Sequence, residues 1–365
     1  MKRKYIIPIF IPHKGCPNAC VFCNQKKISG AKGDIDINEV RKTIESYLEN
    51  FENVDMEIEI AFFGGSFTAI DQDEQEALLE VANEYIKMKK VDSIRISTRP
   101  DCIDKNILKF LKKYKVKTIE LGVQSAVDDV LKNSKRGHDF ESVKKASKLI
   151  KQHRFVLGHQ MMVGLPDSSR RDEMNTAMEL CKLKPKLMRI YPVLVIKNTE
   201  LETMYKNGEY TPLTLEQAID RVKELFYIFD KKNIEIIRVG LQNTDTIKNP
   251  KEDNSDVVAG PYHEAFRQLV EASIWYDAIV TKIKSIPTIT KKIEIRVNPE
   301  NVNNVIGHKK ENIKKVKELY DVSVKVVGDP KIKPEKIQLE ISENYTDFLD
   351  GDAKSNKKAN MKMFK

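Results

Sequence analysis

The sequence lacks long apolar runs and has few cysteines. No apolar stretch approaches the roughly 20 residues that a membrane-spanning helix needs. The apolar stretch at residues 5–12 is short, contains two prolines and has no small-residue cleavage site, so it predicts a buried first strand rather than a signal peptide. Five cysteines, three of them clustered, do not form the framework of a disulfide-rich secreted domain. We therefore expect a soluble protein of the reducing cytoplasm, with no membrane partner.

Acidic residues are in the minority, and the overall balance is basic. The formal net charge is +9 and the isoelectric point is about 9.0. Residues 291–365 hold 17 Lys or Arg against 12 Asp or Glu, a surplus of five, so about half of the excess lies in the last fifth of the chain. Such a balance is compatible with a polyanionic partner such as nucleic acid, although by itself it says more about solubility.

Three cysteines near the start, Cys16, Cys20 and Cys23, follow the spacing C-x3-C-x2-C. A cubane iron–sulfur cluster normally takes four thiolates, and no fourth cysteine follows at a suitable spacing. The remaining iron would be open to a small-molecule ligand. The alternatives are a structural zinc site, for which His13 is the nearby candidate, and thiols that share a loop by chance. The odd number of ligands and their spacing together favour the cluster.

This cysteine loop resembles that of the radical S-adenosylmethionine (radical SAM) superfamily. The resemblance implies a 4Fe-4S cluster held by Cys16, Cys20 and Cys23, with the amino and carboxylate groups of SAM on the free iron. It further implies that an electron from the cluster cleaves SAM to methionine and a 5′-deoxyadenosyl radical. A donor such as flavodoxin or ferredoxin would supply that electron.

Residues 1–240 alternate between apolar strand patterns and amphipathic helix patterns. Strands are expected near residues 58–63, 93–98, 118–122, 160–163, 187–191 and 234–239, with helices of 11 or more residues between most of them. This rhythm predicts an α/β fold with a parallel sheet, in the form of a partial (β/α)6 barrel over residues 1–245. In parallel α/β folds the chemistry lies at the carboxyl ends of the strands, where the notable motifs of this sequence fall.

Several motifs follow these strands in order. Gly64-Gly65-Ser66 would let a ligand approach the backbone closely, because glycine has no Cβ. Later strands lead to further candidates for binding SAM, namely Arg99, Glu120, Gln124 and Arg189. Each motif could also have a purely structural role: a tight turn, a buried ion pair, or a core histidine at His138 or His159. Gly164-Leu165-Pro166 could likewise be a turn, and Cys102 and Cys181 are expected to be core thiols.

As an ordered set, the motifs resemble the radical SAM domain of the Elongator catalytic subunit, a tRNA-modifying enzyme, over roughly residues 5–245. A weaker resemblance extends to coproporphyrinogen-dehydrogenase-type radical SAM proteins. The resemblance implies that Gly64, Gly65 and Ser66 bind the amino group of SAM, and that Arg99 and Gln124 lie near its carboxylate and ribose. The Elongator family spaces its first two cysteines more widely and carries an acetyltransferase domain that has no counterpart here, so its carboxymethyl chemistry is not transferred.

The last part of the chain has a different pattern. Residues 246–288 are expected to form a connecting loop and helix, and residues 289–345 read as β–turn–α–β–β, which resembles a minimal KH domain. KH domains clamp a nucleic-acid backbone on a GXXG loop. The equivalent loop here is Gly307-His308-Lys309-Lys310, so lysine replaces the second glycine, and with Lys314 it forms the expected RNA-binding set. The alternative is a packing or dimerisation module. Residues 346–365 are expected to be a basic, disordered tail.

Together these features predict a radical SAM enzyme, a transferase or oxidoreductase, that modifies tRNA or rRNA. Two alternatives remain open at this stage. One is a radical SAM enzyme that acts on a small molecule or tetrapyrrole, and the other is an iron–sulfur RNA-binding sensor that does not turn SAM over. The sequence does not indicate which atom loses hydrogen or which group is installed.

Overall fold

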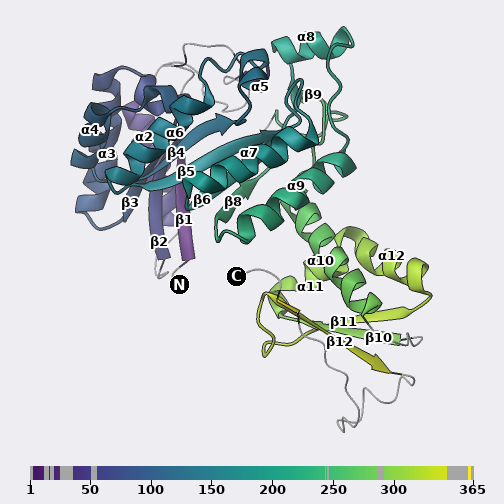
Figure 1. Cartoon of the computed structure of the whole chain (residues 1–365). Coiled ribbons are helices and arrows are strands. Elements are labelled where there is room, and N and C mark those ends of the chain that lie inside the picture. Colours follow the sequence, from purple (N-terminus) through teal and green to yellow (C-terminus); the bar gives the residue numbers. More distant parts are fainter. Residues whose placement is uncertain are drawn as a thin grey trace. The chain divides into compact units, whose positions relative to one another are not determined.

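The computed structural model describes residues 3–11, 16, 20–24, 36–50, 56–242, 244, 246–285, 292–342 and 361–362. The chain divides into two compact units, residues 1–218 with 231–264 and residues 219–230 with 265–365 (Figure 1). The predicted first region ended at residue 245 without interruption. The structure differs at residues 219–230, which pack with the second unit although residues on both sides of them in the sequence belong to the first.

The first unit is built on a seven-stranded sheet in which all neighbouring strands are parallel. Its strands follow chain order across the sheet, as expected for successive βα units. They are β1 (Arg3–Ile11), β2 (Met56–Gly64), β3 (Ser93–Thr98), β4 (Val116–Gln124), β5 (Val156–Val163), β6 (Leu187–Pro192) and β8 (Glu235–Val239). The structure therefore confirms the predicted partial barrel.

Helices follow most of these strands. They are α2 (Ile37–Glu49), α3 (Gln72–Lys87), α4 (Lys105–Lys113), α5 (Asp128–Asn133), α6 (Phe140–Gln152), α7 (Arg170–Leu183) and α8 (Glu200–Lys206), with short 3-10 turns η1 (Phe67–Ala69) and η2 (Pro100–Cys102). Most begin with a side chain that accepts a backbone N–H, such as Asp104 before α4. The first of them is capped by Asp36, whose side chain accepts the N–H of Asn38.

The core of the first unit lies along the sheet. Helices α2, α4, α6 and α7 contact strands β1, β4 and β5, and Figure 1 shows α3, α4, α6 and α7 lined up beside the sheet. All six residues of β3 are buried, because a parallel sheet in this architecture is covered on both faces. The strands also carry buried charged side chains, among them Glu59, Arg95 and Glu120, which is unusual in a core.

Residues 241–262 are more ordered than their polar, turn-rich sequence suggests. Within them, β9 (Val257–Ala259) pairs antiparallel with β7 (Val195–Ile196), which follows β6. A small apolar cluster supports this pair and consists of Leu194, Ile196, Ile247 and Val257. Strands of two and three residues are too short to show a periodic sequence pattern, so the sequence did not predict this element.

The second unit contains α10 (Phe266–Lys284) and most of α9 (Leu215–Asp230), together with a small α+β module. The module consists of β10 (Lys292–Val297), η3 (Pro299–Asn301), α11 (Val302–Ile306), η4 (His308–Lys310), α12 (Glu311–Tyr320), β11 (Ser323–Gly328) and β12 (Lys336–Ser342). Strand β10 pairs parallel with β11 and antiparallel with β12, so the sheet is mixed. The small C-terminal α+β domain is thus present.

The end of the chain contains a short strand. The structure places β13 (Met361–Lys362) against β12, which differs from the disorder predicted for residues 346–365 at this point. The rest of that predicted tail lies outside the described residues.

In the described part of the chain, no helix combines the length and apolar character needed to cross a bilayer.

Candidate cofactor site

The described part of the cysteine loop, Cys16 and residues 20–24, is fastened to two distant segments. The N–H of Val21 donates to the Ser134 carbonyl at 3.2 Å, and the N–H of Leu201 donates to the Val21 carbonyl at 2.8 Å. The side-chain amide of Asn24 donates to the Lys197 carbonyl at 3.1 Å. The loop is therefore held between the end of α5 and the start of α8.

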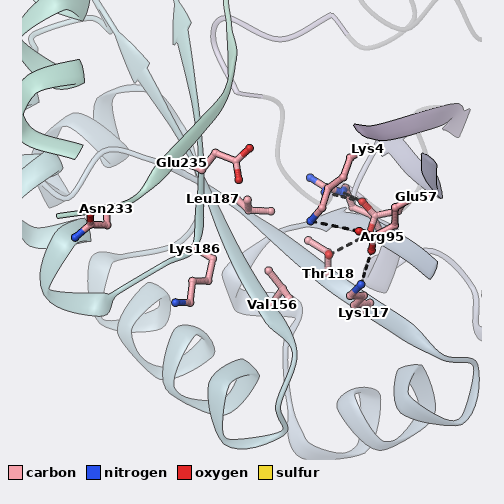
Figure 2. Close-up of a pocket in the computed structure, with 11 residues that line it drawn as sticks. Lys4, Glu57, Arg95, Lys117, Thr118, Val156, Lys186, Leu187, Asn233 and Glu235 are labelled. Carbon is pink, nitrogen blue, oxygen red and sulfur yellow. Dashed lines mark hydrogen bonds and ion pairs between the residues drawn. The ribbon is translucent and has the colours of Figure 1, made fainter. Parts of the chain in front are cut away.

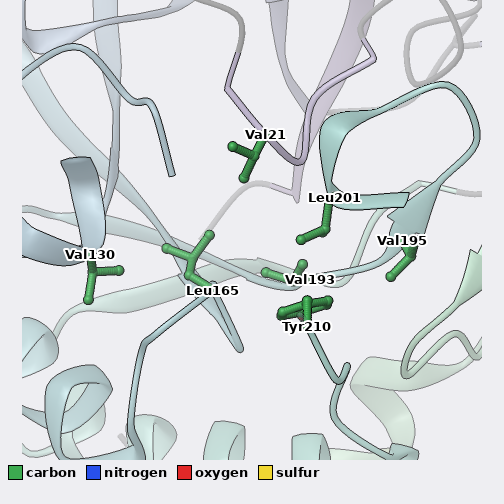
Figure 3. Close-up of a cluster of buried hydrophobic side chains, with 7 residues drawn as sticks. All are labelled: Val21, Val130, Leu165, Val193, Val195, Leu201 and Tyr210. Carbon is green, nitrogen blue, oxygen red and sulfur yellow. The ribbon is translucent and has the colours of Figure 1, made fainter. Parts of the chain in front are cut away.

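An apolar cluster supports the same loop. Val21 lies next to Cys20 in the sequence and packs among buried side chains from four later segments (Figure 3), which are Val130, Leu165, Val193, Val195, Leu201 and Tyr210. Leu165 belongs to the Gly164-Leu165-Pro166 motif, and the Tyr210 hydroxyl donates to the Gly164 carbonyl at 2.6 Å. The Gly164-Leu165-Pro166 motif therefore takes part in the apolar packing against the cysteine loop. Close packing around Val21 keeps the backbone next to Cys20 in one position.

Two guanidinium groups reach the cysteine sulfurs. Arg99 Nη1 lies 3.9 Å from Cys16 Sγ, and Arg136 Nη1 lies 3.5 Å from Cys20 Sγ. Arg99 is only 2% exposed and is fixed by Asp101, whose carboxylate accepts from Nε at 3.0 Å and from Nη2 at 2.9 Å. A cationic donor at each sulfur suits a thiolate ligand of iron, because the liganding form carries negative charge.

Arg136 was not among the residues predicted for the site. Its Nη2 donates to the Gly122 carbonyl at 2.7 Å. A Cβ at Gly122 would lie 2.6 Å from the same nitrogen, so a larger residue there would displace the guanidinium from this position. Arg136 lies in the turn between α5 and α6, and its contact with Cys20 depends on the tertiary fold, so no local pattern marked it.

The glycine–serine motif lies where strands β1 and β2 end together. Gly64 pairs with Ile11, the last residue of β1, and has φ +105°. A Cβ on Gly64 would lie 2.6 Å from the Ile11 carbonyl oxygen, which excludes any other residue. The Ser66 hydroxyl lies 2.9 Å from that of Thr98 and accepts the N–H of Arg99 at 3.2 Å. The motif therefore joins the end of β1 to the end of β3.

Cys102 lies at the margin of this site, which differs from the predicted core thiol. Its side chain is half-buried and interacts with Ser66 and, electrostatically, with Cys16. Burial raises the pKa of the Cys102 thiol, and the Asp101 carboxylate adds to the increase. Cys181 lies in α7, where burial raises its thiol pKa as well.

Three buried polar atoms beside the cysteine loop have no hydrogen-bond partner in the described part of the chain. They are Gln124 Oε1, Arg136 Nε and His138 Nε2. Gln124 also has a positive φ of 71°, a strained conformation for a residue other than glycine. Unsatisfied groups of this kind are costly, so their concentration here indicates a surface prepared for a ligand with both donors and acceptors.

Glu120 and Arg189 are brought together, but they are bound to each other. Glu120 is 1% exposed and accepts from Arg189 Nε at 2.5 Å and from Arg95 Nη1 at 2.5 Å. Burial alone would raise the pKa of Glu120, but the charges of Arg189 and Arg95 outweigh it and hold that pKa below its usual value. The Arg189 guanidinium also stacks 4.7 Å from the centre of the Phe63 ring, just before Gly64. Through these contacts the two residues link strand β4 to β3 and β6, and β6 to β2.

A cavity of about 310 Å³ lies at the opposite, amino end of the strands (Figure 2). Its walls include Glu59 and Arg95, joined by ion pairs at 2.6 Å, and Thr118, whose hydroxyl donates to Glu59 at 3.1 Å. At the rim, Lys117 pairs with Glu57 at 2.6 Å. Glu59, Arg95 and Thr118 satisfy one another's hydrogen-bonding groups. None of the predicted site residues lines this cavity. Residues at the amino ends of barrel strands usually contribute to stability, so we assign this cavity no part in binding the cofactor.

Among the described residues, no three His, Cys, Asp or Glu side chains are grouped around a point that would suit a single metal ion. A cubane cluster binds each thiolate through a different iron, so it does not require such a grouping. The site fits a cluster with a polar ligand better than it fits a single zinc ion. It offers the close backbone approach at Gly64, the guanidinium groups of Arg99 and Arg136, and the unpartnered polar atoms.

The second unit contains the loop predicted to bind RNA. Gly307 has φ +78°, and a Cβ there would lie 2.9 Å from the side chain of Asn312. That asparagine is buried and donates to the Ala272 carbonyl at 2.8 Å, which anchors the loop to α10. Lys309 and Lys310 both have left-handed backbone conformations, with φ 50° and 63°. Lys310 thus adopts a glycine-like conformation at the position of the lost second glycine.

Comparison with known proteins decides the family. Residues 10–180 match the family described as the Radical SAM superfamily, and residues 185–276 match the family described as the Radical_SAM C-terminal domain. The chain belongs to the radical SAM superfamily. It is accordingly a radical SAM enzyme whose family cofactors are a 4Fe-4S cluster and SAM.

The relatives place this radical SAM chain close to the Elongator type. A protein of Methanocaldococcus jannaschii named "Uncharacterized protein MJ0486" is 34% identical over 238 residues, which is 61% of this chain and 72% of that one. The tRNA uridine(34) acetyltransferase of the same organism is 32% identical over 194 residues, or 47% of this chain and 36% of that one. Human Elongator complex protein 3 is 26% identical over 210 residues, covering 51% and 38% of the two chains.

A solved structure agrees with this assignment at the level of the fold. It is an Elp3 of Methanocaldococcus infernus with an N-terminal deletion, at a TM-score of 0.58 and 24% identity, covering 77% of this chain and 64% of that one. The radical SAM chain spans only a little over a third of the tRNA uridine(34) acetyltransferase and of the human Elongator protein.

Proposed function

We propose that this radical SAM enzyme modifies RNA, with the radical generated in the first unit and RNA bound by the second. The observation that carries the proposal is the similarity of about half of the chain to proteins named tRNA uridine(34) acetyltransferase and Elongator complex protein 3. Because the chain spans little more than a third of those relatives, the proposal takes over the RNA substrate class and leaves out acetyl transfer.

Cys16, Cys20 and Cys23 would hold the cluster, and the segment from Gly64 to Ser66 would lie against the amino group of SAM. When bound, the cluster and SAM together supply a 5′-deoxyadenosyl radical that can abstract a hydrogen atom. The donor set supports this placement, since Arg99 and Arg136 already lie at two of the three sulfurs. Gln124 offers an unpartnered buried amide oxygen to a ribose hydroxyl.

The chain itself would position and shield the reacting groups. Asp101 fixes the Arg99 guanidinium, and the apolar cluster around Val21 keeps water away from the loop backbone. The Glu120–Arg189 and Glu120–Arg95 pairs connect three strands of the sheet, β3, β4 and β6. We assign Glu120 and Arg189 this positioning role, in preference to direct contact with SAM.

RNA would be bound by the loop between α11 and α12. Lys309, Lys310 and Lys314 are exposed and lie in or just after the loop, next to the N-terminus of α12, so their charges face solvent where phosphate could approach. Gly307 allows the tight chain path and His308 follows it. The target nucleotide would have to be unstacked or single-stranded to reach a site formed by buried groups.

The domain plan follows from the same reasoning. We propose a radical SAM half-barrel over residues 1–245, a connector over 246–288 and a KH-like module over 289–345, with residues 346–365 adding basic charge. A small reducing protein such as flavodoxin or ferredoxin would act as the partner that supplies electrons, because the cluster must be reduced before each turnover.

The test is an anaerobic assay of the reconstituted enzyme with SAM and dithionite. 5′-Deoxyadenosine is quantified without RNA, with total tRNA and with rRNA. Cys20→Ala removes a proposed cluster ligand, and Cys181→Ala is the matched control because that half-buried cysteine lies in α7, away from the loop. We expect one RNA fraction to stimulate product formation in the wild type and in the control, and Cys20→Ala to form none.

Two results would replace the proposal. Cleavage that no RNA fraction stimulates would indicate a small-molecule or tetrapyrrole substrate and a packing role for the second unit. An intact cluster without any cleavage of SAM would indicate an iron–sulfur RNA-binding sensor.

A further inference from the structure

His138 lies at the edge of the cofactor site, and neither the predicted site nor the proposed function assigns it a role. It follows Gly137, whose φ of 76° turns the chain just after Arg136. The side chain is partly buried, and its Nε2 atom is fully buried with no hydrogen-bond partner in the described residues. A buried ring nitrogen without a partner is uncommon in a native protein and requires a physical reason.

The geometry fixes the chemical form of this ring. His138 Nδ1 lies 3.3 Å from the carbonyl oxygen of Asp139, which can only accept, so Nδ1 carries the hydrogen. Burial lowers the pKa of His138 to about 4, and the nearby Arg136 charge contributes to the decrease, so the ring is neutral at physiological pH. Nε2 therefore presents a lone pair and acts as a hydrogen-bond acceptor.

The surroundings indicate what this acceptor binds. Gln124 Oε1, Arg136 Nε and His138 Nε2 all come from the segment that ends β4 and enters α6, and all three are unpartnered. Arg136 connects this group to Cys20, and the charges of Arg99 and Asp101 act on His138. A ligand bound here meets two acceptors and one donor beside the cysteine loop. A nucleoside matches this pattern, since it combines hydroxyl and amino donors with ring and carbonyl acceptors.

We propose that His138 Nε2 accepts a hydrogen bond from an N–H or O–H group of a nucleoside bound beside the cysteine loop. The nucleoside is either the adenosine part of SAM or the target nucleotide of RNA. The RNA source rests on the proposed function, whereas the SAM source depends only on membership of the radical SAM superfamily. His138 is accordingly a ligand-contacting residue, distinct from the proposed iron ligands.

Two substitutions isolate the Nε2 position. His138→Gln places an amide atom near the position of Nε2 and keeps an acceptor there. His138→Asn is shorter, so it can still reach the Asp139 carbonyl but leaves the Nε2 position empty. The matched control is His153→Asn, because His153 is also partly buried and places its Nδ1 2.9 Å from a backbone carbonyl, that of Leu149, at the end of α6.

The experiment measures binding on the cluster-reconstituted, full-length protein. Anaerobic calorimetry gives the affinity for SAM, and fluorescence anisotropy with SAM present gives the affinity for an anticodon stem–loop RNA that carries uridine at the first anticodon position. Loss of one neutral hydrogen bond should weaken binding about 3- to 10-fold. We expect His138→Asn to weaken one of the two affinities by this factor, and we expect His138→Gln and His153→Asn to remain near the wild type.

The two arms identify the source of the nucleoside. A change in SAM affinity assigns the contact to SAM, and this result stands even if the protein does not modify RNA. A change in RNA affinity alone assigns it to the target nucleotide. If both affinities stay at wild-type values in His138→Asn, the proposal is wrong. It is also wrong if Gln and Asn weaken binding equally while iron content matches the wild type, since that pattern reflects packing alone.

Discussion

The two units present their candidate functional residues in opposite ways. In the first unit Arg99, Glu120 and Gln124 are buried and each is oriented by its neighbours or left unpartnered at one atom. In the second unit Lys309, Lys310 and Lys314 are exposed. Buried, oriented polar groups can select a small ligand by its hydrogen-bonding pattern, whereas exposed lysines bind phosphate by charge and tolerate many sequences. We therefore expect chemical specificity in the first unit and general RNA affinity in the second.

The largest effect should come from the cysteine loop. Cys16→Ala or Cys23→Ala removes a proposed iron ligand, so the enzyme should lose the cluster and all detectable 5′-deoxyadenosine formation. Iron and sulfide content with product quantification are the measurements. Cys102→Ala serves as a demanding control, because this half-buried cysteine lies beside Ser66 at the same site. A cluster of normal content in either loop variant would contradict the assignment.

Glu120→Gln should strongly destabilise the first unit. It leaves the buried Arg95 and Arg189 guanidiniums without their anion, and breaking a buried pair in this way costs about 3–5 kcal/mol. Chemical denaturation of the purified protein measures the loss. In the control, Glu57→Gln removes the partner of the exposed Lys117 and should cost less than about 1 kcal/mol. Similar losses in both variants would mean that the buried network does not support the sheet.

Acid should destabilise the first unit through His159. Burial lowers the pKa of His159 to about 3 from 6.5, and its Nε2 bonds Ser147 at 2.9 Å. Below pH 6.5 His159 is protonated in the unfolded chain but stays neutral in the folded chain. The contribution of His159 to the free energy of unfolding is therefore complete above pH 6.5 and is lost as the pH falls toward 3. The slope approaches on the order of 1.4 kcal/mol per pH unit. Denaturation curves at several pH values should show that His159→Gln lacks this part of the slope.

The exposed lysines should change RNA affinity without changing the radical chemistry. Replacing Lys309, Lys310 and Lys314 together with alanine should reduce the dependence of log affinity on log salt by roughly 0.7–0.9 for each phosphate that the loop no longer binds. Formation of 5′-deoxyadenosine without RNA should stay unchanged. Lys317→Ala is the control, because Lys317 is exposed further along α12. An unchanged salt slope in the triple variant would exclude this loop as the RNA site.

The smallest predicted effect separates charge from backbone conformation. Lys310 has φ 63° and ψ 27°, where glycine avoids the strain of a side chain. Lys310→Gly should therefore raise the stability of the second unit by about 0.5–1 kcal/mol and weaken RNA binding through the lost charge. Thermal unfolding and anisotropy measure the two effects. A variant that loses both stability and affinity would show that the lysine side chain packs onto the loop.

The sequence was most informative where function depends on neighbouring residues. The three cysteines and the Gly64-Gly65-Ser66 segment could be proposed from the sequence because their spacing is local. Contacts between distant segments could not, such as Arg136 with Cys20 and Val21 with Leu201, because only the folded sheet brings these segments together. Glu120 and Arg189 were expected to bind SAM, but a sequence cannot show that these two charges pair across the sheet, from β4 to β6.

The central claim is that this enzyme modifies RNA, and transfer of hydrogen from RNA to 5′-deoxyadenosine tests it most directly. Transfer RNA transcribed from deuterated nucleotides is incubated anaerobically with the reconstituted enzyme, SAM and dithionite, and the 5′-deoxyadenosine is analysed by mass spectrometry. The account predicts that deuterium from the RNA appears in 5′-deoxyadenosine. It also predicts that unlabelled RNA and the Cys20→Ala variant give none. Unlabelled 5′-deoxyadenosine, formed in the same amount with and without deuterated RNA, would contradict the claim.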